Sequence, residues 1–237
     1  MKKSLGQHFL INPRIHEKIV EAAEIKAKDT VVEIGPGSGL LTDHLLATGA
    51  HVIAIEKDSE FVSQLREKYR NNKNIEIVES DVLRYTLHVT PYKLVGNIPY
   101  YLTSHLIRVV LQEWPQPKLI VFTVQKEVAK RMTAKPPKMN MLAVLVQCYC
   151  KAEIVATIKR GNFRPIPKVD SAIVKLVHSD QWIVDSEKIL KVASVAFKNP
   201  RKMLKNNIPE ELVRKAGIDP SRRAETLTIQ EWQKLSM

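Results

Sequence analysis

The sequence predicts an α/β fold in which a parallel sheet is covered by helices on both faces and is followed by a small helical domain. Strand and helix signals alternate through the first half of the chain, and strand signals disappear from Trp182 onward. Alternating strands and helices form parallel sheets, because each helix carries the chain back to the edge where the next strand starts. The predicted domains are residues 1–180 and 181–237, joined near residues 178–181.

The strands are predicted from short runs rich in β-branched residues, and the helices from apolar residues spaced by three and four. The expected strands are residues 30–34, 51–56, 75–78, 93–96, 119–125, 153–158 and 172–177. The expected helices are residues 40–47, 103–111 and 59–69, the last with Ser59 as its N-cap. Residues 141–147 fit either a helix or a strand, because a short continuous apolar run has no period that separates the two.

The composition is that of a globular protein with a hydrophobic core. Hydrophobic residues make up 44% of the chain and charged residues 26%, and no apolar run reaches the roughly 18 residues of a membrane span. The first residues lack the apolar stretch of a signal peptide, so we expect a cytoplasmic protein without a membrane partner. Cys148 and Cys150 have no neighbouring His or Cys, so we expect reduced thiols and no metal site.

Positive charge is concentrated in one part of the chain. The net charge is +12 at pH 7, yet residues 1–117 hold 14 basic and 14 acidic residues. Residues 118–175 hold 12 basic and 3 acidic residues, and residues 176–237 hold 11 and 8. A regional excess of this kind favours a polyanion partner, such as nucleic acid, over a uniformly solubilising basic surface.

A glycine-rich turn follows the first expected strand, and an acidic residue follows each of the next two. The turn contains Gly35 and Gly37, which allow a tight bend and a close approach of backbone to ligand. Glu56 can accept hydrogen bonds from both ribose hydroxyls of a nucleoside cofactor, and Asp81 can accept from an adenine amino group. The turn is not G-x-G-x-x-G, and Glu33 would lie close to a pyrophosphate. A zwitterionic amino-acid moiety therefore fits the turn better than NAD does.

Asn97-Ile98-Pro99-Tyr100 follows the fourth expected strand. An adenine amine is a poor nucleophile because its lone pair is delocalised into the ring. The Asn97 side-chain oxygen and the Ile98 carbonyl can accept the hydrogens of the amine and direct its lone pair at a sulfonium methyl group. Pro99 restricts the backbone that presents this carbonyl, and Tyr100 can stack on an extruded base. These four residues, hereafter the tetrad, predict methyl transfer from S-adenosyl-L-methionine to adenine N6.

With three further motifs, the turn and the tetrad resemble the ribosomal RNA adenine dimethyltransferases over nearly the whole chain. The further motifs are Gly6-Gln7-His8-Phe9-Leu10, Gln125-Lys126-Glu127 and the nine residues from Phe163 to Ser171. Residues 169–171, 201–206 and 222–225 resemble the ribosome-biogenesis branch more than the macrolide-resistance branch. The resemblance implies a Rossmann-like class I methyltransferase domain with a small C-terminal helical domain. It also implies dimethylation of two adjacent adenosines in the 3′-terminal hairpin of small-subunit rRNA.

The same resemblance implies which residues form the site. The cofactor would contact His8, Leu10, Gly35, Gly37, Glu56, Asp81, Val82 and Asn97. Phe163 would form the second wall of the base pocket, opposite Tyr100. The family commonly has Asn at the position of His8 and a small residue at that of Tyr101, so we expect the contacts at these two positions to differ.

The second domain is expected to dock RNA. Its residues 198–205 contain four basic residues and no acid, which suits phosphate contacts on a helix face, although a solvated helix surface has the same pattern. The four are Lys198, Arg201, Lys202 and Lys205. The expected partner is the immature small ribosomal subunit, and the protein is expected to be a monomer. Two alternatives are large-subunit rRNA methylation and a non-catalytic nucleic-acid-binding relative; the intact tetrad argues against the second.

Overall fold

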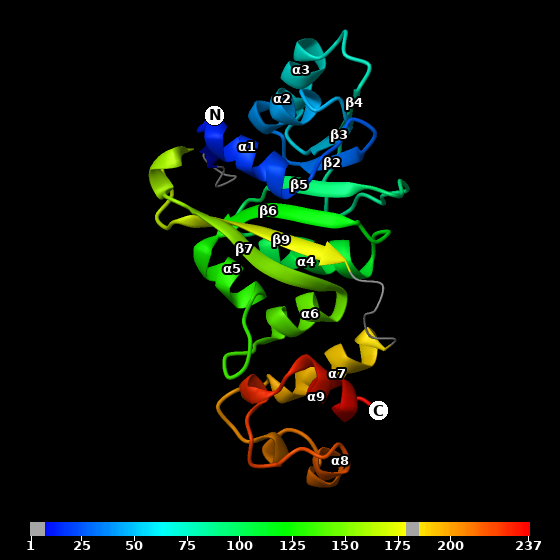
Figure 1. Cartoon of the computed structure of the whole chain (residues 1–237), viewed down its shortest axis with the longest axis vertical. Helices are drawn as coiled ribbons and strands as arrows, with labels where there is room; N and C mark the ends of the chain where they lie inside the picture. The colour runs from blue at the N-terminus through cyan, green and yellow to red at the C-terminus, as the bar shows by residue number, and fades with distance from the viewer. Residues whose placement is uncertain (1–7, 179–184) are drawn as a thin grey trace. The chain divides into compact units, whose positions relative to one another are not determined.

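The computed structural model describes residues 8–178 and 185–237, and the chain divides into two compact units (Figure 1). Unit 1 is Met1–Ala129 with Glu153–His178, and unit 2 is Lys130–Ala152 with Ser179–Met237. Residues 130–152 were expected in the first domain, but the structure groups them with the C-terminal helices. The expected junction at residues 178–181 lies mostly outside the described residues, as do Gly6 and Gln7 of the N-terminal motif.

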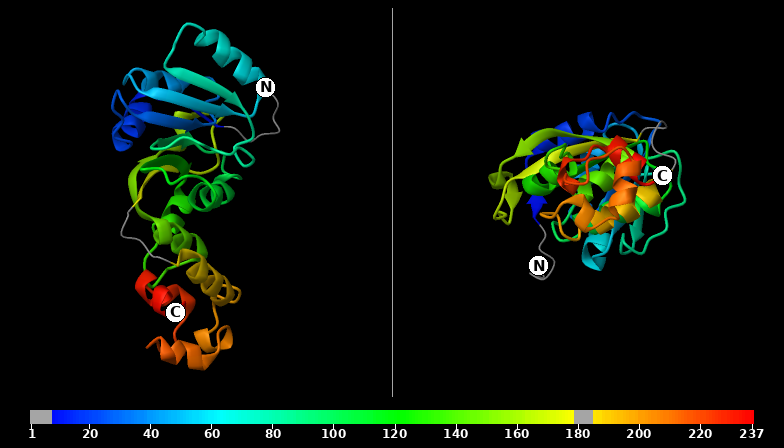
Figure 2. Two further views of the ribbon diagram at one scale, coloured as in Figure 1. Left: turned by 90° about the vertical axis from the view of Figure 1, so that its right-hand side faces the viewer. Right: turned by 90° about the horizontal axis from the view of Figure 1, so that it is seen from below.

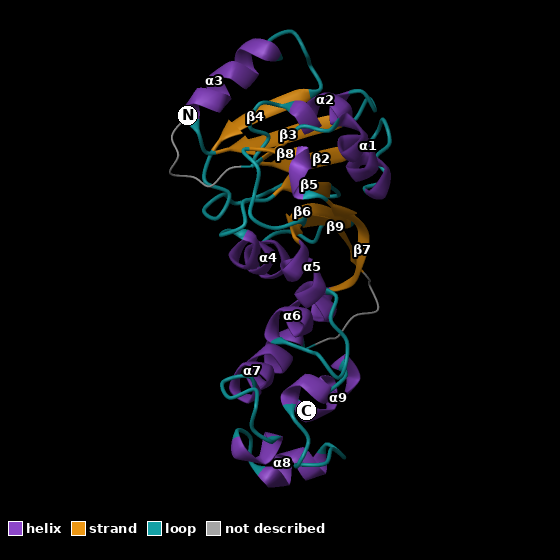
Figure 3. Cartoon of the chain, turned by 90° about the vertical axis from the view of Figure 1, so that its left-hand side faces the viewer, coloured by secondary structure: helices purple, strands orange, loops and turns teal. Residues whose placement is uncertain are grey.

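The predicted α/β fold is confirmed, since unit 1 is built on a seven-stranded sheet (Figures 1 and 3). In spatial order, its strands are β4 (Ile75–Glu79), β3 (His51–Glu56), β2 (Thr30–Ile34), β5 (Lys93–Asn97), β6 (Leu119–Gln125), β9 (Ser171–His178) and β7 (Cys150–Ile158). The first five pair in parallel, and β9 is antiparallel to β6. The chain first adds β3 and β4 on one side of β2, then crosses to add β5 and β6 on the other. Ligands of such sheets bind beyond the carboxyl ends of the strands, at this reversal.

Polar caps explain where several helices of unit 1 begin. The Asn12 side chain accepts the N–H of Arg14 at the start of α1 (Pro13–Ala22). The cap of α3 (Ser59–Lys68) is Asp58 and not Ser59, because the carboxylate of Asp58 accepts the N–H of Glu60. The remaining helices before residue 133 are α2 (Leu40–Leu46), α4 (Thr103–Gln112) and α5 (Lys126–Met132). In Figure 3, α1 and α2 lie side by side.

One hydrophobic core of unit 1 lies on the side of the sheet that α1 and α2 cover. Successive strand residues point to opposite faces, and Val31, Val95 and Val121 point to this one with no exposed surface. A separate two-stranded sheet, formed by β1 (Phe9–Leu10) and β8 (Phe163–Arg164), adds one residue of each strand to the same core.

Unit 2 is helical (Figure 2). Its longer helices are α6 (Met141–Tyr149), α7 (Ser186–Ala196), α8 (Glu210–Lys215) and α9 (Ile229–Leu235). Residues 141–147 form a helix because the Asn140 side chain caps it, accepting the N–H groups of Leu142 and Ala143. Packing of α6 against α7 and α9 is the physical reason why residues 130–152 belong to this unit. Trp232 of α9 is fully buried, with its ring 5.6 Å from that of Phe197.

Two absences hold for the residues that the structure describes. None of their helices is both long enough and apolar enough to cross a membrane, and no group of His, Cys, Asp and Glu side chains is arranged to hold a metal ion. Cys148 and Cys150 are free, buried thiols, and burial raises the pKa of each to about 12. A thiol with such a pKa is almost entirely protonated at neutral pH and therefore unreactive.

Candidate active site

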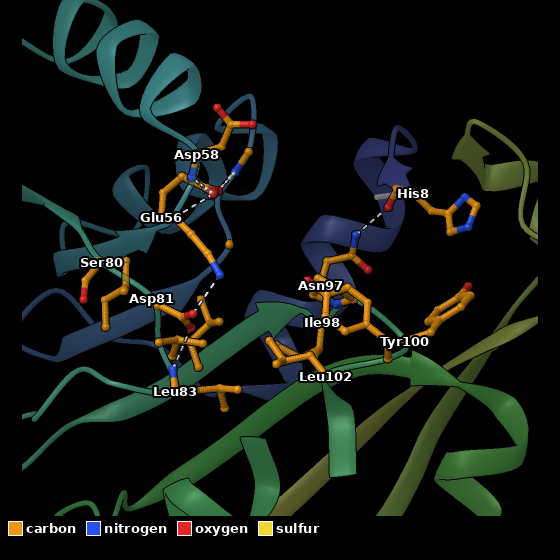
Figure 4. A pocket seen from close by; sticks show the side chains of 18 of the residues that line it. His8, Glu56, Asp58, Ser80, Asp81, Leu83, Asn97, Ile98, Tyr100 and Leu102 are labelled. Carbon is orange, nitrogen blue, oxygen red and sulfur yellow. Dashed lines mark hydrogen bonds and ion pairs between the residues drawn. The ribbon is translucent and has the colours of Figure 1, made fainter. Parts of the chain in front are cut away.

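A pocket lies at the carboxyl ends of β2, β3, β4 and β5, where the order of the strands reverses (Figure 4). The residues that line it belong to or follow these strands, or lie at β1: His8, Phe9, Ile34, Gly35, Gly37, Ile55, Glu56, Lys57, Asp58, Ser80, Asp81, Val82, Leu83, Asn97, Ile98, Pro99, Tyr100, Tyr101 and Leu102. Figure 4 shows two groups on opposite sides. We call Glu56, Asp58 and Asp81 the acidic half, and His8, Asn97 and Tyr100 the aromatic half.

The glycine turn has the backbone conformation that only glycine adopts without strain. Gly35 and Gly37 have φ of 65° and 55°. A Cβ atom on Gly37 would also lie 2.8 Å from Cε1 of Phe9, far inside van der Waals contact. Both glycines line the pocket, and their N–H groups donate to the Ile55 carbonyl oxygen at 3.0 Å and to Glu56 at 3.1 Å.

Glu56 is the last residue of β3, and the backbone holds its carboxylate in place. Its Oε2 accepts the N–H of Gly37 at 3.1 Å, and its Oε1 accepts those of Lys57 at 2.8 Å and Asp58 at 2.9 Å. The side chain is only 4% exposed. A carboxylate has about four acceptor positions, so the backbone takes three and leaves one for a ligand hydroxyl.

Asp81 is held from two sides. Its Oδ1 accepts the N–H of Leu83 at 3.1 Å, and its Oδ2 lies 2.8 Å from Nζ of Lys57. The hydrogen bond from Lys57 lowers the pKa of Asp81, so the carboxylate is ionised at neutral pH. The Lys57 side chain is 64% exposed, so it can swing away from Asp81 at small cost when a ligand donor replaces it.

Glu33 does not take the place that the sequence suggested. It is 1% exposed, it does not line the pocket, and its Oε2 accepts the hydroxyl of Thr42 of α2 at 2.6 Å. Burial raises the pKa of Glu33 to about 8. Of the two expected contacts of Glu33 with an amino-acid moiety, direct or through water, this arrangement does not form the direct one, because alternation along β2 turns the side chain toward α2.

The tetrad presents two free acceptors. The Asn97 amide nitrogen donates to the backbone oxygen of His8 at 2.8 Å, which fixes the orientation of the amide. The Ile98 N–H donates to the Thr123 carbonyl oxygen at 3.1 Å. Neither Asn97 Oδ1 nor the Ile98 carbonyl accepts a hydrogen bond from any residue that the structure describes. Two acceptors in adjacent residues, both fixed through their donors, suit an amino group with two hydrogens.

The rings of the aromatic half are held by Pro165, just after β8, and by Ser171, the first residue of β9. Tyr100 Oη lies 2.8 Å from Ser171 Oγ, and His8 Nδ1 lies 2.8 Å from the Pro165 carbonyl oxygen. A carbonyl oxygen only accepts, so Nδ1 of His8 carries the hydrogen. The two rings are 5.5 Å apart between centroids and tilted by 34°. Burial raises the pKa of Tyr100, so its hydroxyl stays protonated.

Leu10 and Phe163 lie away from the pocket, in the core. They are register partners in the sheet of β1 and β8, and they are 3% and 1% exposed. Because successive strand residues point to opposite sides, Phe9 lines the pocket in place of Leu10. Phe163 has no exposed face for a base. The structure therefore does not form the predicted base pocket wall at Phe163, opposite Tyr100. The ring beside Tyr100 is that of His8.

The other residues predicted for the site line the pocket, but several lining residues were not predicted. His8, Val82 and Pro99 line the pocket with the residues described above. Lys57 was missed although it directly follows Glu56, and Ser171 was predicted only as part of a motif. The position after an acid at a strand end is a local signal that identifies Lys57; no local signal identifies a partner 71 residues from Tyr100.

The basic run is exposed but is not helical where it was expected to be. Lys198, Arg201, Lys202 and Lys205 follow the end of α7 at Ala196, and only Lys205 lies in a short 3-10 helix. Pro200 explains this, because proline cannot continue an α-helix. Among the described residues, no acid forms an ion pair with any of the four.

The fold and this site define a Rossmann-like methyltransferase. A solved dimethyladenosine transferase from Plasmodium falciparum matches with a TM-score of 0.84 at 29% identity, over 96% of both chains. The 23S rRNA methyltransferase ErmE matches with a TM-score of 0.80 at 28% identity, over 96% of this chain and 98% of its own.

The chain belongs to the ribosomal RNA adenine dimethylase family, whose model matches residues 1–237. "Ribosomal RNA small subunit methyltransferase A" of Dehalococcoides mccartyi is 40% identical and covers 100% of this chain and 87% of its own length. The protein of the same name from Clostridium botulinum is 38% identical, over 99% of this chain and 92% of its own. The predicted family is therefore confirmed.

Proposed function

We propose that the protein uses S-adenosylmethionine to dimethylate N6 of two adjacent adenosines in the 3′-terminal hairpin of small-subunit rRNA, during ribosome assembly. The observation that carries the proposal is the pair of acceptors, Asn97 Oδ1 and the Ile98 carbonyl, which no described residue uses and which share one pocket with the glycine turn and the acidic half. The names of the curated relatives support the small subunit, and the likeness to ErmE keeps large-subunit rRNA as the second candidate substrate.

The acidic half suits a nucleoside, because it offers acceptors held in fixed positions. Glu56 has one acceptor position free for a ribose hydroxyl, and a second hydroxyl requires the 3.1 Å bond from Gly37 to open. Asp81 can accept from an adenine amino group when Lys57 moves aside. The glycine turn, which lines the pocket, would lie against the amino-acid part, and the sulfonium would supply the methyl group that is transferred.

The aromatic half suits the attacking amine. Asn97 Oδ1 and the Ile98 carbonyl would accept its two hydrogens, which localises the lone pair on N6 and points it at the methyl carbon. The new N–C bond forms as the C–S bond breaks, and the nitrogen then loses one proton to water. Tyr100 would stack on the base once it has left its helix. An N6-monomethyl amine keeps one hydrogen, so one acceptor of the pair can still orient it for the second transfer.

We further propose a cytoplasmic, monomeric protein that docks on the immature small subunit. A direct test is to incubate the purified protein with S-adenosylmethionine and small-subunit particles from a strain that lacks the enzyme. The two adjacent adenosines should become N6,N6-dimethylated, as mapped by mass spectrometry of RNase digests. Methylation confined to large-subunit rRNA would transfer the proposal to the second candidate, and methylation of neither would refute it.

The four cations of the basic run are proposed to contact RNA phosphates. Replacing all four by Ala should weaken particle binding and lower the slope of log affinity against log salt by about 0.7–0.9 for each phosphate that is no longer neutralised. Cofactor affinity should not change. The double variant Lys188→Ala, Lys191→Ala is a matched control, because these exposed lysines already pair with acids. An unchanged slope in the quadruple variant would assign docking to the cations of residues 118–175 instead.

A further inference from the structure

Tyr100 is tied to the sheet by one hydrogen bond. Its hydroxyl lies 2.8 Å from Oγ of Ser171, the first residue of β9. Tyr100 itself is in the turn between β5 and α4, outside regular structure. Ser171 is fully buried and pairs in register with Gln125 of β6. The bond therefore joins a side chain on a turn to a side chain on the rigid sheet.

The backbone before Ser171 is held on both sides. The backbone carbonyl oxygen of Asp170 accepts the N–H of Lys126 at 3.0 Å. The side-chain carboxylate of Asp170 accepts the N–H of Arg160 at 3.0 Å and a hydrogen bond from Nζ of Lys159 at 3.3 Å. The Ser171 hydroxyl is thus presented from a fixed point, and its hydrogen-bond partner among the described residues is Tyr100. A buried hydroxyl needs such a partner, so a serine here is explained by the tyrosine.

We infer that Ser171 is a positioning residue that holds the Tyr100 ring in place for the target adenine. The inference rests on the proposed function and adds to it. The hydroxyl oxygen of a tyrosine lies on the axis of the Cβ–ring bond, so the bond to Ser171 does not stop rotation about that axis, but it holds the far end of the side chain and thereby selects its χ1 rotamer. The bond therefore sets where the ring lies, and the His8 ring, 5.5 Å away between centroids, packs beside it; stacking on a base requires the ring to lie at that place. Ser171 acts through Tyr100 and does not itself touch the base.

His8 supports this assignment. Its ring lies beside Tyr100, and its Nδ1–H donates to Pro165, six residues before Ser171. Both rings of the aromatic half are therefore tied at their polar atoms to one segment, residues 165–171. These residues belong to the nine-residue motif from Phe163 to Ser171. The two hydrogen bonds bring this motif next to the tetrad, so both motifs contribute to the pocket.

The test is a double-mutant cycle with Ser171→Ala and Tyr100→Phe, measured as single-turnover methyl transfer to small-subunit particles at saturating S-adenosylmethionine. Each single variant should slow transfer by roughly 2- to 12-fold, the range for one neutral hydrogen bond. The double variant should be no slower than the slower single variant, because both substitutions remove the same bond. Cofactor affinity should stay within about twofold of wild type, since the acidic half is untouched.

Two more variants separate positioning from general stability. Ser63→Ala is a control for the loss of a serine hydroxyl outside the pocket, because the exposed Ser63 donates to the Ser59 carbonyl within α3. Ser171→Thr keeps the hydroxyl and should retain most of the wild-type rate. If Ser171→Ala does not fold, Tyr100→Phe still tests the bond from its other end.

The outcomes are distinguishable. Wild-type rates in both single variants, or effects that multiply in the double variant, would overturn the role of Ser171 while leaving the proposed function intact. Wild-type protein that transfers no methyl group to adenine would refute the proposed function, and the positioning role with it. A 2-aminopurine base at the target position provides a second measurement: Ser171→Ala should reduce its fluorescence quenching in the complex, and unchanged quenching would contradict the inference.

Discussion

The two halves of the pocket are built in different ways. In the acidic half, Glu56 is held by N–H groups of the glycine turn and of its own next two residues, so its partners lie at most 19 residues away. In the aromatic half, Asn97 bonds to a residue 89 positions away, Tyr100 to one 71 away and His8 to one 157 away. The first half is a product of successive βα turns, whereas the second exists only when three distant segments have come together.

The difference shows that the aromatic half depends on the folding of more of unit 1 than the acidic half does. The acidic half needs only the strands β2, β3 and β4 and the turns that follow them. The aromatic half also needs β1, β8 and the start of β9 to be in place. Substitutions in the acidic half should therefore act locally, on cofactor affinity, and substitutions in the aromatic half should act on several contacts at once.

The largest effect is expected from Glu56→Ala. It leaves three backbone N–H groups without their acceptor and removes the proposed ribose partner. Loss of one side of a set of buried hydrogen bonds costs about 1–3 kcal/mol, so the Kd for S-adenosylmethionine should rise about 5- to 150-fold in calorimetry. Glu79→Ala, at the exposed end of neighbouring β4, is the matched control and should bind normally. Unchanged affinity in a folded Glu56→Ala protein would remove this residue from the site.

Asn97→Ala should act on the other half and on a different quantity. With the cofactor saturating, we expect methyl transfer to fall at least about tenfold, which corresponds to about 1.4 kcal/mol of transition-state stabilisation. Particle binding should persist, because the basic run is unaffected. The exposed Asn71→Ala serves as the control. Near-normal turnover would mean that the tetrad is only a turn, and the contrast between the two halves would then have no catalytic meaning.

The same contrast explains what could be predicted from the sequence. Gly35, Gly37, Glu56 and Asp81 stand at successive strand ends, and a parallel sheet brings successive strand ends to one edge whatever its finer details. These four were found from spacing alone. The tertiary bonds of the aromatic half have no such rule behind them, so Asn97 and Tyr100 could be named as a motif, but not their partners.

Two errors have the same physical cause. Leu10 was assigned to the cofactor by the family resemblance and Glu33 by its place just before the glycine turn, but alternation along a strand turns each away from the pocket and leaves a neighbour facing it. Phe163 follows the same rule on β8. The expected helix at the basic run failed for another reason, since Pro200 ends the helical path. At these positions the residue types could be read from the sequence, but the side to which each side chain points could not. That direction depends on how the strands pair, which is set only when the chain folds.

The last comparison concerns stability and two buried acids on neighbouring strands. Glu56 accepts three backbone N–H groups, whereas Glu33 has one hydrogen bond from Thr42 and a pKa raised to about 8 by burial. Between an unfolded pKa near 4.5 and this value, the folded state holds a proton that the unfolded state has lost. Stability should therefore fall as pH rises through this window, by at most about 1.4 kcal/mol per pH unit.

Glu33→Gln removes this titration while its side-chain oxygen can still accept the Thr42 hydroxyl. Urea unfolding between pH 5.5 and pH 7, about one unit inside the two pKa values, should show a flatter curve for the variant than for wild type. The difference should be smallest at the acid end, where both proteins carry a neutral side chain, and should grow toward the alkaline end in favour of the variant. Glu76→Gln, on an exposed position of β4, should run parallel to wild type. Parallel curves for Glu33→Gln as well would show that Glu33 is ionised throughout, and that the two acids do not differ in the way the hydrogen bonds indicate.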